Sequence, residues 1–395
     1  MPFDLDLVIV GGCGRVGLPL GLAFADRGLS VALYDVNERA VGQVSNGEMP
    51  FHEDGASEVL ARVGSNLVAT MDPSDVARAE HVIVVIGTPV DEHLDPRPTA
   101  VPDAIEALAP HLRDGQVLVL RSTLYPGVTA MVERLIERLG VKVDVAFCPE
   151  RIAEGAALKE LFDLPQIVAS RTATGQARAE KLFSALTAST VPLSPEEAEL
   201  AKLFTNTWRY IKFATANQLF MIANDFGLDF GRIRAAMTFD YPRAADLPGA
   251  GFAAGPCLLK DTMQLAAFNN NNFVLGHASM MVNEGLPLYI VSKMEESFDL
   301  ANATVGVLGM AFKGGSDDTR DSLAYKLRRI LRFKARRVLS TDPCVTSDAS
   351  LVPLGTVLAE SDILVLAAPH REYRDLDTTL PLVDVWGFTG TATLV

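Results

Sequence analysis

The sequence predicts an α/β protein in which two Rossmann-like, doubly wound domains are joined by a long central helix. Three observations support this fold class. Short apolar runs alternate with helical segments in the amino-terminal part, a long helical segment then interrupts the alternation, and the alternation returns near the carboxyl end. Strands that alternate with helices in this way form parallel sheets.

The amino-terminal domain begins with a βαβ unit. Leu5–Val10 and Leu29–Tyr34 are predicted strands, and Val16–Arg27 is the helix between them. Further predicted strands and helices then alternate along the chain. The strands are His81–Ile86, Val117–Leu120 and Val143–Phe147, and the helices are Val101–His111 and Val128–Leu139. This alternation predicts a parallel, doubly wound sheet.

The central segment is helical. Ser194 and Pro195 mark a helix start, and apolar residues then recur at helical spacing to Phe226. A second helical segment covers Leu275–Phe298. Strand and helix patterns then return in a smaller Rossmann-like domain that lacks a glycine fingerprint. Its predicted strands are Thr304–Leu308, Arg337–Ser340 and Ile363–Ala367, and its predicted helix is Asp321–Phe333.

Composition excludes several classes of protein. The 395 residues are 49% hydrophobic, enough for more than one core, but the longest uncharged stretch is interrupted by asparagines and a histidine. We therefore expect no membrane-spanning helix. The net charge of −14 argues against nucleic-acid binding. The four cysteines show neither disulfide-framework nor metal-ligand spacing, so we expect reduced thiols and no metal. Without a secretion signal at the amino terminus, a cytoplasmic location is expected.

A dinucleotide fingerprint follows the first strand. Gly12, Gly14 and Gly17 surround Arg15 and Val16 in a Gly-x-Gly-x-x-Gly pattern that opens a helix. Glycines allow a tight turn and close approach of a pyrophosphate to the helix N-terminus. Asp35 closes the next strand, where an acid binds a ribose hydroxyl and repels a 2′-phosphate. The pattern predicts NAD rather than NADP.

A single thiol, Cys257, lies in the glycine-rich stretch Gly249–Asp261. Such a cysteine is either a packed apolar side chain or a nucleophile, and the loop alone leaves both possibilities open. Lys202 and Asn206 are one helical turn apart, so both project from one face of the long helix. They are either surface residues or part of a site.

Three loops follow predicted strands, where doubly wound sheets bind ligands. They are Arg121–Gly127, Pro149–Gly155 and Gly309–Ser322. Ordinary turn chemistry would also explain the first two, and a helix cap would explain the third. If the third loop binds phosphate, Lys313 and Arg320 are its candidate cations.

Taken in order, these segments resemble the nucleotide-sugar 6-dehydrogenases, the family of UDP-glucose, GDP-mannose and UDP-N-acetylmannosamine dehydrogenases. The resemblance covers essentially the whole chain. The matching motifs are Gly12-x-Gly14-x-x-Gly17-Leu18-Pro19, Gly87-Thr88-Pro89, Ser122-Thr123 with Pro126-Gly127, Pro149-Glu150 with Glu154-Gly155, Lys202 with Asn206, the Cys257 loop, and Ala311-Phe312-Lys313 with Asp317-Asp318-x-Arg320-x-Ser322. The resemblance implies an NAD-binding domain (1–194), a central helical dimerisation domain (195–300), a nucleotide-sugar-binding domain (301–395) and a homodimer.

The resemblance also implies a reaction: a C6 alcohol of a UDP-sugar is oxidised to the carboxylate with two NAD⁺. Cys257 would form a thiohemiacetal and then a thioester. The implied catalytic residues are Cys257, Lys202, Asn206, Asp261, Thr123, Glu150 and Glu154, with the general base left open. The implied cofactor-binding residues are Gly12, Gly14, Arg15, Val16, Gly17, Asp35, Thr88, Ser122, Thr123 and Arg320. The implied substrate-binding residues are Glu150, Arg151, Lys202, Asn206, Arg243, Gly251, Phe252, Lys313 and Arg371.

The motifs divide between two substrate branches. Cys148–Arg151 and Pro242-Arg243 resemble enzymes that oxidise UDP-N-acetylhexosamines such as UDP-ManNAc or UDP-GlcNAc, whereas Cys257–Asp261 is closer to UDP-glucose 6-dehydrogenases. The first branch is favoured and the second is kept as the alternative. A two-electron dehydrogenase with a structural Cys257, and a non-catalytic nucleotide-binding protein, are the other hypotheses.

Overall fold

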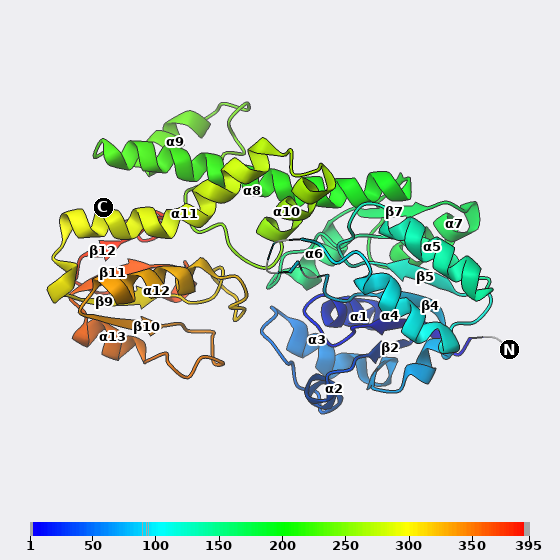
Figure 1. The fold of residues 1–395 in the computed structure, drawn as a ribbon. Helices are drawn as coiled ribbons and strands as arrows, with labels where there is room; N and C mark the ends of the chain where they lie inside the picture. Colours follow the sequence, from blue (N-terminus) through cyan, green and yellow to red (C-terminus); the bar gives the residue numbers. More distant parts are fainter. Residues whose placement is uncertain (1–2, 89, 92, 94, 391–395) are drawn as a thin grey trace. The chain divides into compact units, whose positions relative to one another are not determined.

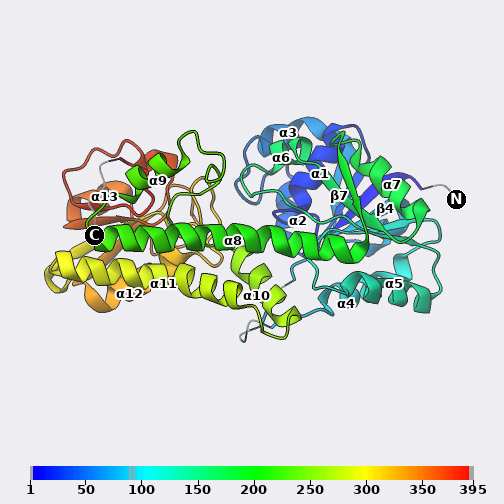
Figure 2. The same ribbon diagram turned by 90° about the horizontal axis from the view of Figure 1, so that it is seen from above.

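The computed structural model describes residues 3–88, 90, 91, 93 and 95–390. The chain divides into two compact units, Met1–Phe204 and Thr205–Val395. The boundary lies inside helix α8 (Pro195–Asp225), so this helix begins in the amino-terminal unit and ends in the carboxy-terminal unit (Figure 2). The predicted long central helix is therefore confirmed.

The amino-terminal unit contains an eight-stranded sheet in the order β3-β2-β1-β4-β5-β6-β7-β8 (Figure 1). Its strands are β1 (Leu5–Val10), β2 (Val31–Tyr34), β3 (Leu67–Thr70), β4 (Ala79–Val84), β5 (Val117–Leu120), β6 (Asp144–Phe147), β7 (Gln166–Ser170) and β8 (Thr190–Leu193). Strands β1 to β6 are parallel, as predicted. Strand β7 runs antiparallel to β6, which the prediction of a parallel sheet did not include.

Helices cover both faces of this sheet. They are α1 (Gly17–Asp26), α2 (Glu38–Ser45), α3 (Ala56–Val63), α4 (Ala100–Leu108), α5 (Val128–Leu139), α6 (Ala157–Asp163) and α7 (Ala173–Phe183). Alternate residues of β1 point to opposite faces, so Leu7 and Ile9 pack with α1 and α3. Val8 and Val10 pack in a second core with α4 and α5 (Figure 2). Because both faces are covered, a strand inside the sheet such as β5 is apolar and buried along its whole length.

The carboxy-terminal unit contains a smaller parallel sheet in the order β10-β9-β11-β12. Its strands are β9 (Thr304–Leu308), β10 (Arg337–Thr341), β11 (Ile363–Leu366) and β12 (Leu382–Val383). Its other helices are α9 (Phe230–Thr238), α10 (Leu258–Phe268), α11 (Val274–Ser297), α12 (Leu323–Lys334) and α13 (Leu354–Glu360). One core packs α11 and α12 against this sheet, and a second core contains α13 (Figure 1). The second Rossmann-like domain is thus confirmed.

Polar side chains join α8 to α11 in this unit. Asn217 of α8 donates to Oδ1 of Asn283 of α11 at 2.9 Å, and Asn224 donates to the hydroxyl of Tyr289 at 3.0 Å. The two helices lie side by side (Figure 2). Buried amides of this kind are satisfied only when the helices keep one register, so the pairs align α8 with α11.

None of the helices in the described part of the chain combines the length and the hydropathy that a membrane span requires. The four cysteines all lie in the described part of the chain, and none forms a disulfide. Burial raises the pKa of Cys13 and of Cys148 to about 12, with the charge of Asp35 adding to the effect at Cys13. These two thiols are therefore protonated and unreactive near neutral pH.

Candidate active site and cofactor cradle

The fingerprint glycines of the amino-terminal unit have different surroundings. A Cβ at Gly12 would lie 2.7 Å from the Cα of Leu33, and one at Gly17 would lie 2.4 Å from the carbonyl oxygen of Gly11. Both glycines are required by close packing of the protein on itself. A Cβ at Gly14 would approach only the carbonyl oxygen of Gly11, at 3.5 Å. Packing within the chain therefore leaves room for a side chain at Gly14.

The residues around these glycines fit a dinucleotide. Val16 precedes α1 without a side-chain cap. The N–H of Leu18 donates to the carbonyl of Gly14 at 2.9 Å, and the positive end of the helix dipole at this turn favours an anion. Asp35 directly follows β2, and its Oδ2 accepts the backbone N–H of Cys13 at 3.0 Å. The fingerprint turn and the acid at the end of β2 are thus held together. Arg15 stacks over Phe51 at 5.0 Å, and its Nη1 lies 3.9 Å from Oε2 of Glu154.

We expect Gly14→Ala to weaken NAD⁺ binding by about tenfold or more while leaving the melting temperature nearly unchanged. A Cβ there meets only one atom of the protein, and the fingerprint pattern assigns the remaining space to the cofactor. Gly17→Ala should lower the melting temperature as well, because its Cβ meets backbone. Gly42→Ala, in α2 with nothing within 4 Å, is the matched control. NAD⁺ titration calorimetry and thermal melting measure both effects. If Gly14→Ala and Gly17→Ala lowered the melting temperature equally, the assignment of Gly14 to cofactor binding and of Gly17 to packing would be wrong.

The loops after β4 and β5 are joined by a hydroxyl. Oγ of Ser122 accepts the backbone N–H of Ile86 at 2.8 Å. Thr88 follows in the first loop and Thr123 in the second, both at the carboxyl edge of the parallel strands. Pro89 lies outside the described residues. The structure thus places Thr88, Ser122 and Thr123 at the edge where doubly wound sheets bind ligands.

Glu150 lies in a buried ionic cluster. Oε2 of its carboxylate pairs with Nη2 of Arg121, while its Oε1 accepts the backbone N–H groups of Arg151 and Ile152 at 2.7 and 3.0 Å. Arg121 also donates to the carbonyl of Cys148 at 3.0 Å and to Oε1 of Gln166 at 3.2 Å. Every oxygen of the Glu150 carboxylate has a donor, which suits a residue that shapes the 150–155 loop.

The same loop is anchored at its other end by Glu53. Its buried carboxylate accepts the backbone N–H groups of Gly155 and Ala157 at 2.8 and 2.7 Å. Arg151 donates to the carbonyl of Pro165, and burial lowers the pKa of its guanidinium. Together with the Glu150 cluster, these contacts hold the loop that carries Glu154.

The start of α8 is fixed to the amino-terminal unit by Glu199. Its carboxylate accepts the backbone N–H groups of Gly127 and Thr129, at 2.7 and 2.8 Å, at the start of α5. The Thr129 hydroxyl donates to the same carboxylate at 2.6 Å. Lys202 follows Glu199 by nearly one helical turn and is buried. An anchored helix therefore carries a lysine that is buried as a residue, which excludes the interpretation of Lys202 as an ordinary surface residue.

In the carboxy-terminal unit, Asn206 of α8 meets Asp261 of α10. Nδ2 of Asn206 donates to Oδ2 of Asp261 at 2.6 Å, and both side chains are buried. Nζ of Lys260 lies 2.9 Å from Oδ1 of Asp261. Cys257 is exposed at the N-terminal cap of α10, where the helix dipole favours negative charge. Its backbone carbonyl accepts the N–H of Asp261 at 2.9 Å.

The segment before Cys257 is tightly packed rather than flexible. The side-chain amide of Asn217 makes two hydrogen bonds with the backbone of Gly251, at 2.9 and 3.0 Å. A Cβ at Gly251 would lie 2.2 Å from the ring of Trp386, which also packs edge-on against buried Phe252. Gly255 has a φ of +98°, and a Cβ there would lie 2.6 Å from the ring of Phe312. These contacts fix the backbone that leads to the thiol.

The predicted cations of this unit lie on several segments. Lys313 follows β9 and stacks over Phe312 at 5.7 Å, and Arg320 pairs with Asp318 at 2.6 Å. Arg371 begins a short 3₁₀ turn after β11, and Arg243 stacks over Tyr241 at 5.7 Å. Lys313 and Arg320 share the loop after β9, whereas Arg371 and Arg243 belong to other loops.

Comparison with known proteins decides the family. Models of the UDP-glucose/GDP-mannose dehydrogenase family match in three parts: the NAD binding domain at residues 6–187, the central domain at 196–284 and the UDP binding domain at 306–386. The UDP-N-acetyl-D-mannosamine dehydrogenase of Pyrococcus horikoshii is 31% identical, over 94% of this chain and 91% of the relative. The chain belongs to the UDP-glucose/GDP-mannose dehydrogenase family.

Solved structures agree with this assignment. A UDP-glucose dehydrogenase from Pyrobaculum islandicum superposes with a TM-score of 0.91 at 27% identity, over 99% of this chain and 96% of that one. The UDP-D-ManNAc dehydrogenase structure from Pyrococcus horikoshii gives a TM-score of 0.88 at 27% identity, over 96% and 95%. This UDP-glucose/GDP-mannose dehydrogenase family member is an NAD-dependent nucleotide-sugar dehydrogenase. The hypothesis of a non-catalytic nucleotide-binding protein is therefore wrong.

Several residues that build the site of this dehydrogenase were not predicted. Arg121 begins a loop that the sequence singled out without giving the arginine a role, and Glu53 and Asn217 lie in no motif. All three act through contacts with residues distant in sequence. The available signal for Arg121 was a charged residue directly after an apolar strand, because an arginine at the end of a buried strand requires partners. Asp342, Cys344 and His370 also come together, although no sequence spacing indicated a histidine partner for a cysteine.

Proposed function

We propose that the enzyme oxidises the C6 hydroxymethyl group of a UDP-N-acetylhexosamine to the carboxylate, with UDP-ManNAc as the first candidate and UDP-GlcNAc as the second. The observation that carries this choice is the 31% identity, over nearly the whole chain, to a UDP-N-acetyl-D-mannosamine dehydrogenase. The similarity to a UDP-glucose dehydrogenase structure keeps UDP-glucose as the alternative substrate.

Cys257 provides the covalent chemistry in this proposal. Its thiolate adds to the carbonyl carbon of the sugar aldehyde to form a thiohemiacetal, and oxidation of that adduct leaves a thioester. Water then attacks the thioester carbon, the carbon–sulfur bond breaks, and the carboxylate and thiolate are released. The N-terminal position on α10 favours the thiolate in both the attacking and leaving roles. NAD⁺, when bound at the fingerprint glycines, would supply the hydride acceptor for the two oxidations.

Buried polar groups supply the remaining functions. We assign stabilisation of the oxyanion to Lys202 and Asn206, since fixed donors in a dry site favour developing charge. Asp261, which already holds Asn206, manages protons with Thr123. Glu150 shapes its loop through Arg121, which leaves Glu154 and Asp261 as candidate bases.

The binding residues are assigned separately. We assign NAD binding to Gly12, Gly14, Arg15, Val16, Gly17, Asp35, Thr88, Ser122, Thr123 and Arg320. Sugar nucleotide contacts are assigned to Arg151, Arg243, Gly251, Lys313 and Arg371, and to the backbone of Phe252.

A substrate panel tests the proposal. We expect turnover of UDP-ManNAc or UDP-GlcNAc to exceed that of UDP-glucose and GDP-mannose, with two NADH formed per sugar and a product mass of the uronic acid. NADH absorbance and product mass spectrometry give both numbers. Faster turnover of UDP-glucose would instead identify the enzyme as a UDP-glucose 6-dehydrogenase. One NADH per sugar, with the aldehyde as final product, would establish the two-electron alternative.

We further propose three functional parts, at residues 1–194, 195–300 and 301–395, and a cytoplasmic homodimer. The three family models support the division, and reduced cysteines are typical of the cytoplasm. Exposed apolar side chains on α8 support self-association, because Phe204 and Trp208 lie one turn apart and are 53% and 55% exposed.

Trp208→Glu should therefore convert a dimer to a monomer in light scattering coupled to size exclusion, since a charge would be buried at the interface. Phe333→Glu is the control, because Phe333 is 84% exposed on α12, away from α8 in sequence. A wild-type monomer, or a Trp208→Glu dimer of unchanged stability, would contradict the assignment of this surface.

A further inference from the structure

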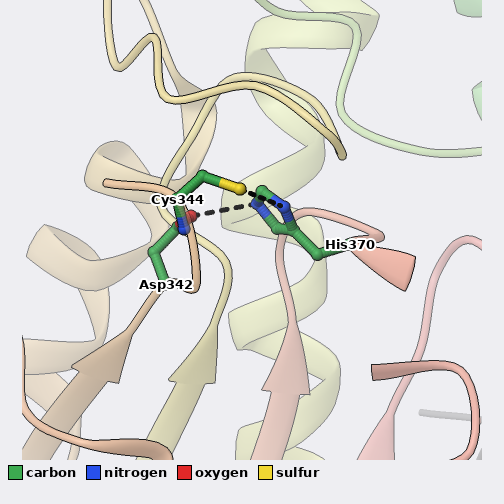
Figure 3. Close-up of side chains that lie close together, drawn as sticks. All are labelled: Asp342, Cys344 and His370. Carbon is green, nitrogen blue, oxygen red and sulfur yellow. Dashed lines mark hydrogen bonds and ion pairs between the residues drawn. The ribbon is translucent and has the colours of Figure 1, made fainter. Parts of the chain in front are cut away.

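Three side chains that the proposed reaction does not use meet at the carboxyl edge of the smaller sheet. Asp342 directly follows β10 and Cys344 lies two residues further on, while His370 follows β11 (Figure 3). The loop after β9, which carries Lys313, lies beside them, because its Met310, Ala311 and Gly315 amides bond to this group. The order β10-β9-β11 makes this edge a topological switch point, where open α/β sheets bind ligands.

Asp342 orients both His370 and the backbone of Cys344. Its Oδ2 accepts Nε2–H of His370 at 3.0 Å and the Met310 and Ala311 amides at 2.6 and 2.9 Å. Its Oδ1 accepts the Cys344 amide at 2.8 Å. Burial alone would raise the pKa of Asp342, but the hydrogen bond and charge of His370 and the backbone amides outweigh it and lower this pKa to about 2. The carboxylate is therefore ionised near neutral pH.

His370 faces the thiol with its other nitrogen. Because Nε2 donates to Asp342, Nδ1 carries the lone pair, which accepts the Gly315 amide at 3.2 Å and lies 3.7 Å from Sγ of Cys344. The thiol, the imidazole and the carboxylate thus stand in the order of nucleophile, base and orienting group (Figure 3). A buried Tyr373 packs edge-on against the imidazole at 5.8 Å, and burial raises the pKa of its hydroxyl, so it adds no charge.

A metal ion fits this cluster poorly. The Asp342 carboxylate is surrounded by N–H donors, which would repel a cation. The two nitrogens of His370 point in opposite directions, one to the carboxylate and one to the sulfur, so a single ion would not reach all three residues along their lone pairs. The arrangement suits thiol chemistry better.

We propose that Cys344 is a reversible modification site that exchanges with a low-molecular-weight disulfide and thereby weakens nucleotide binding. The thiol proton passes to Nδ1 of His370, the sulfur attacks the disulfide, and one thiolate leaves, so a mixed disulfide forms without any other oxidant. Cys344 is partly exposed, whereas Cys13 and Cys148 are buried.

Modification of Cys344 would affect nucleotide binding because Nδ1 of His370 faces both the Cys344 sulfur and the Gly315 amide. A proton on Nδ1, or a group added to Sγ, removes the acceptor of the Gly315 amide and crowds the loop after β9. This loop carries Lys313, so the consequence for binding rests on the proposed contact between Lys313 and the nucleotide. The reactivity of the thiol does not depend on that contact.

The test uses full-length Cys257→Ser protein, in which Cys344 is the remaining partly exposed thiol. We expect the folded Cys257→Ser protein to react with the aromatic disulfide 5,5′-dithiobis(2-nitrobenzoate) and to release one equivalent of coloured thiolate from the reagent. The double variant Cys257→Ser/Cys344→Ser should release none. Adding His370→Gln should slow the labelling of Cys344 about tenfold or more, because a glutamine amide cannot accept the thiol proton as the imidazole does. If that variant does not fold, Asp342→Asn replaces it. Calorimetry with UDP should show at least about tenfold weaker binding after modification, reversed by a reducing thiol.

The outcomes separate the two proposals. Absence of UDP binding to unmodified protein would contradict the proposed substrate class and leave the labelling result intact. A labelling rate unchanged by both His370→Gln and Asp342→Asn, or UDP binding unchanged by modification, would overturn the inference. Faster labelling after treatment with a chelator would also overturn it, because it would show that Cys344 is a metal ligand.

Discussion

Cys257→Ser is expected to abolish formation of the carboxylate, lowering turnover by about a thousandfold or more, because a serine hydroxyl is far less nucleophilic than a thiolate at neutral pH. The sulfur is at the N-terminal cap of α10, where the helix favours its ionised form. The effect should appear in kcat rather than in the affinity for the UDP-sugar. Stopped-flow measurement of NADH and intact-protein mass spectrometry of trapped adducts would measure it.

Cys344→Ser is the matched control for this variant. It removes a partly exposed thiol that the proposed reaction does not use, so steady-state turnover should stay at the wild-type value. If Cys257→Ser retained full turnover with two NADH per sugar, covalent catalysis would be wrong. Full turnover with one NADH per sugar would instead indicate a two-electron dehydrogenase.

Arg121→Met is expected to destabilise the amino-terminal unit by about 3–5 kcal/mol, since it leaves the Glu150 carboxylate buried without its cation. The arginine side chain is fully buried and bonds to Glu150, Gln166 and the carbonyl of Cys148. Urea unfolding followed by circular dichroism measures the loss. The double variant Arg121→Met/Glu150→Gln should recover part of it, because no unpaired charge then remains.

A surface ion pair provides the comparison. Arg337 and Glu360 are 2.7 Å apart, with side chains 55% and 45% exposed. Arg337→Met should change the free energy of unfolding by less than about 1 kcal/mol, because exposed pairs are solvated and screened. Similar losses for Arg121→Met and Arg337→Met would show that the Arg121 cluster does not hold the 150–155 loop.

Much of the fold could be predicted because its signals are local. The apolar runs of β1, β5 and β9 coincide with the observed strands, since buried parallel strands are continuously apolar. Strands β3 and β8 were missed because they are short and partly exposed at the two edges of the larger sheet. The antiparallel β7 was also missed, because strand direction depends on pairing and not on composition.

The residues of the candidate site also fall into two groups, those marked by a local sequence pattern and those brought together by folding. The dinucleotide fingerprint, the long α8 and the glycine-rich stretch around Cys257 could be read from the residue order, because each depends on spacing within one segment. Three contacts became visible only in the folded chain: Glu150 is held by Arg121, Asn206 donates to Asp261, and Cys344 faces His370. Each of these pairs joins residues far apart in the chain. Their energies depend on burial and on the distance between two charges or dipoles, which folding creates.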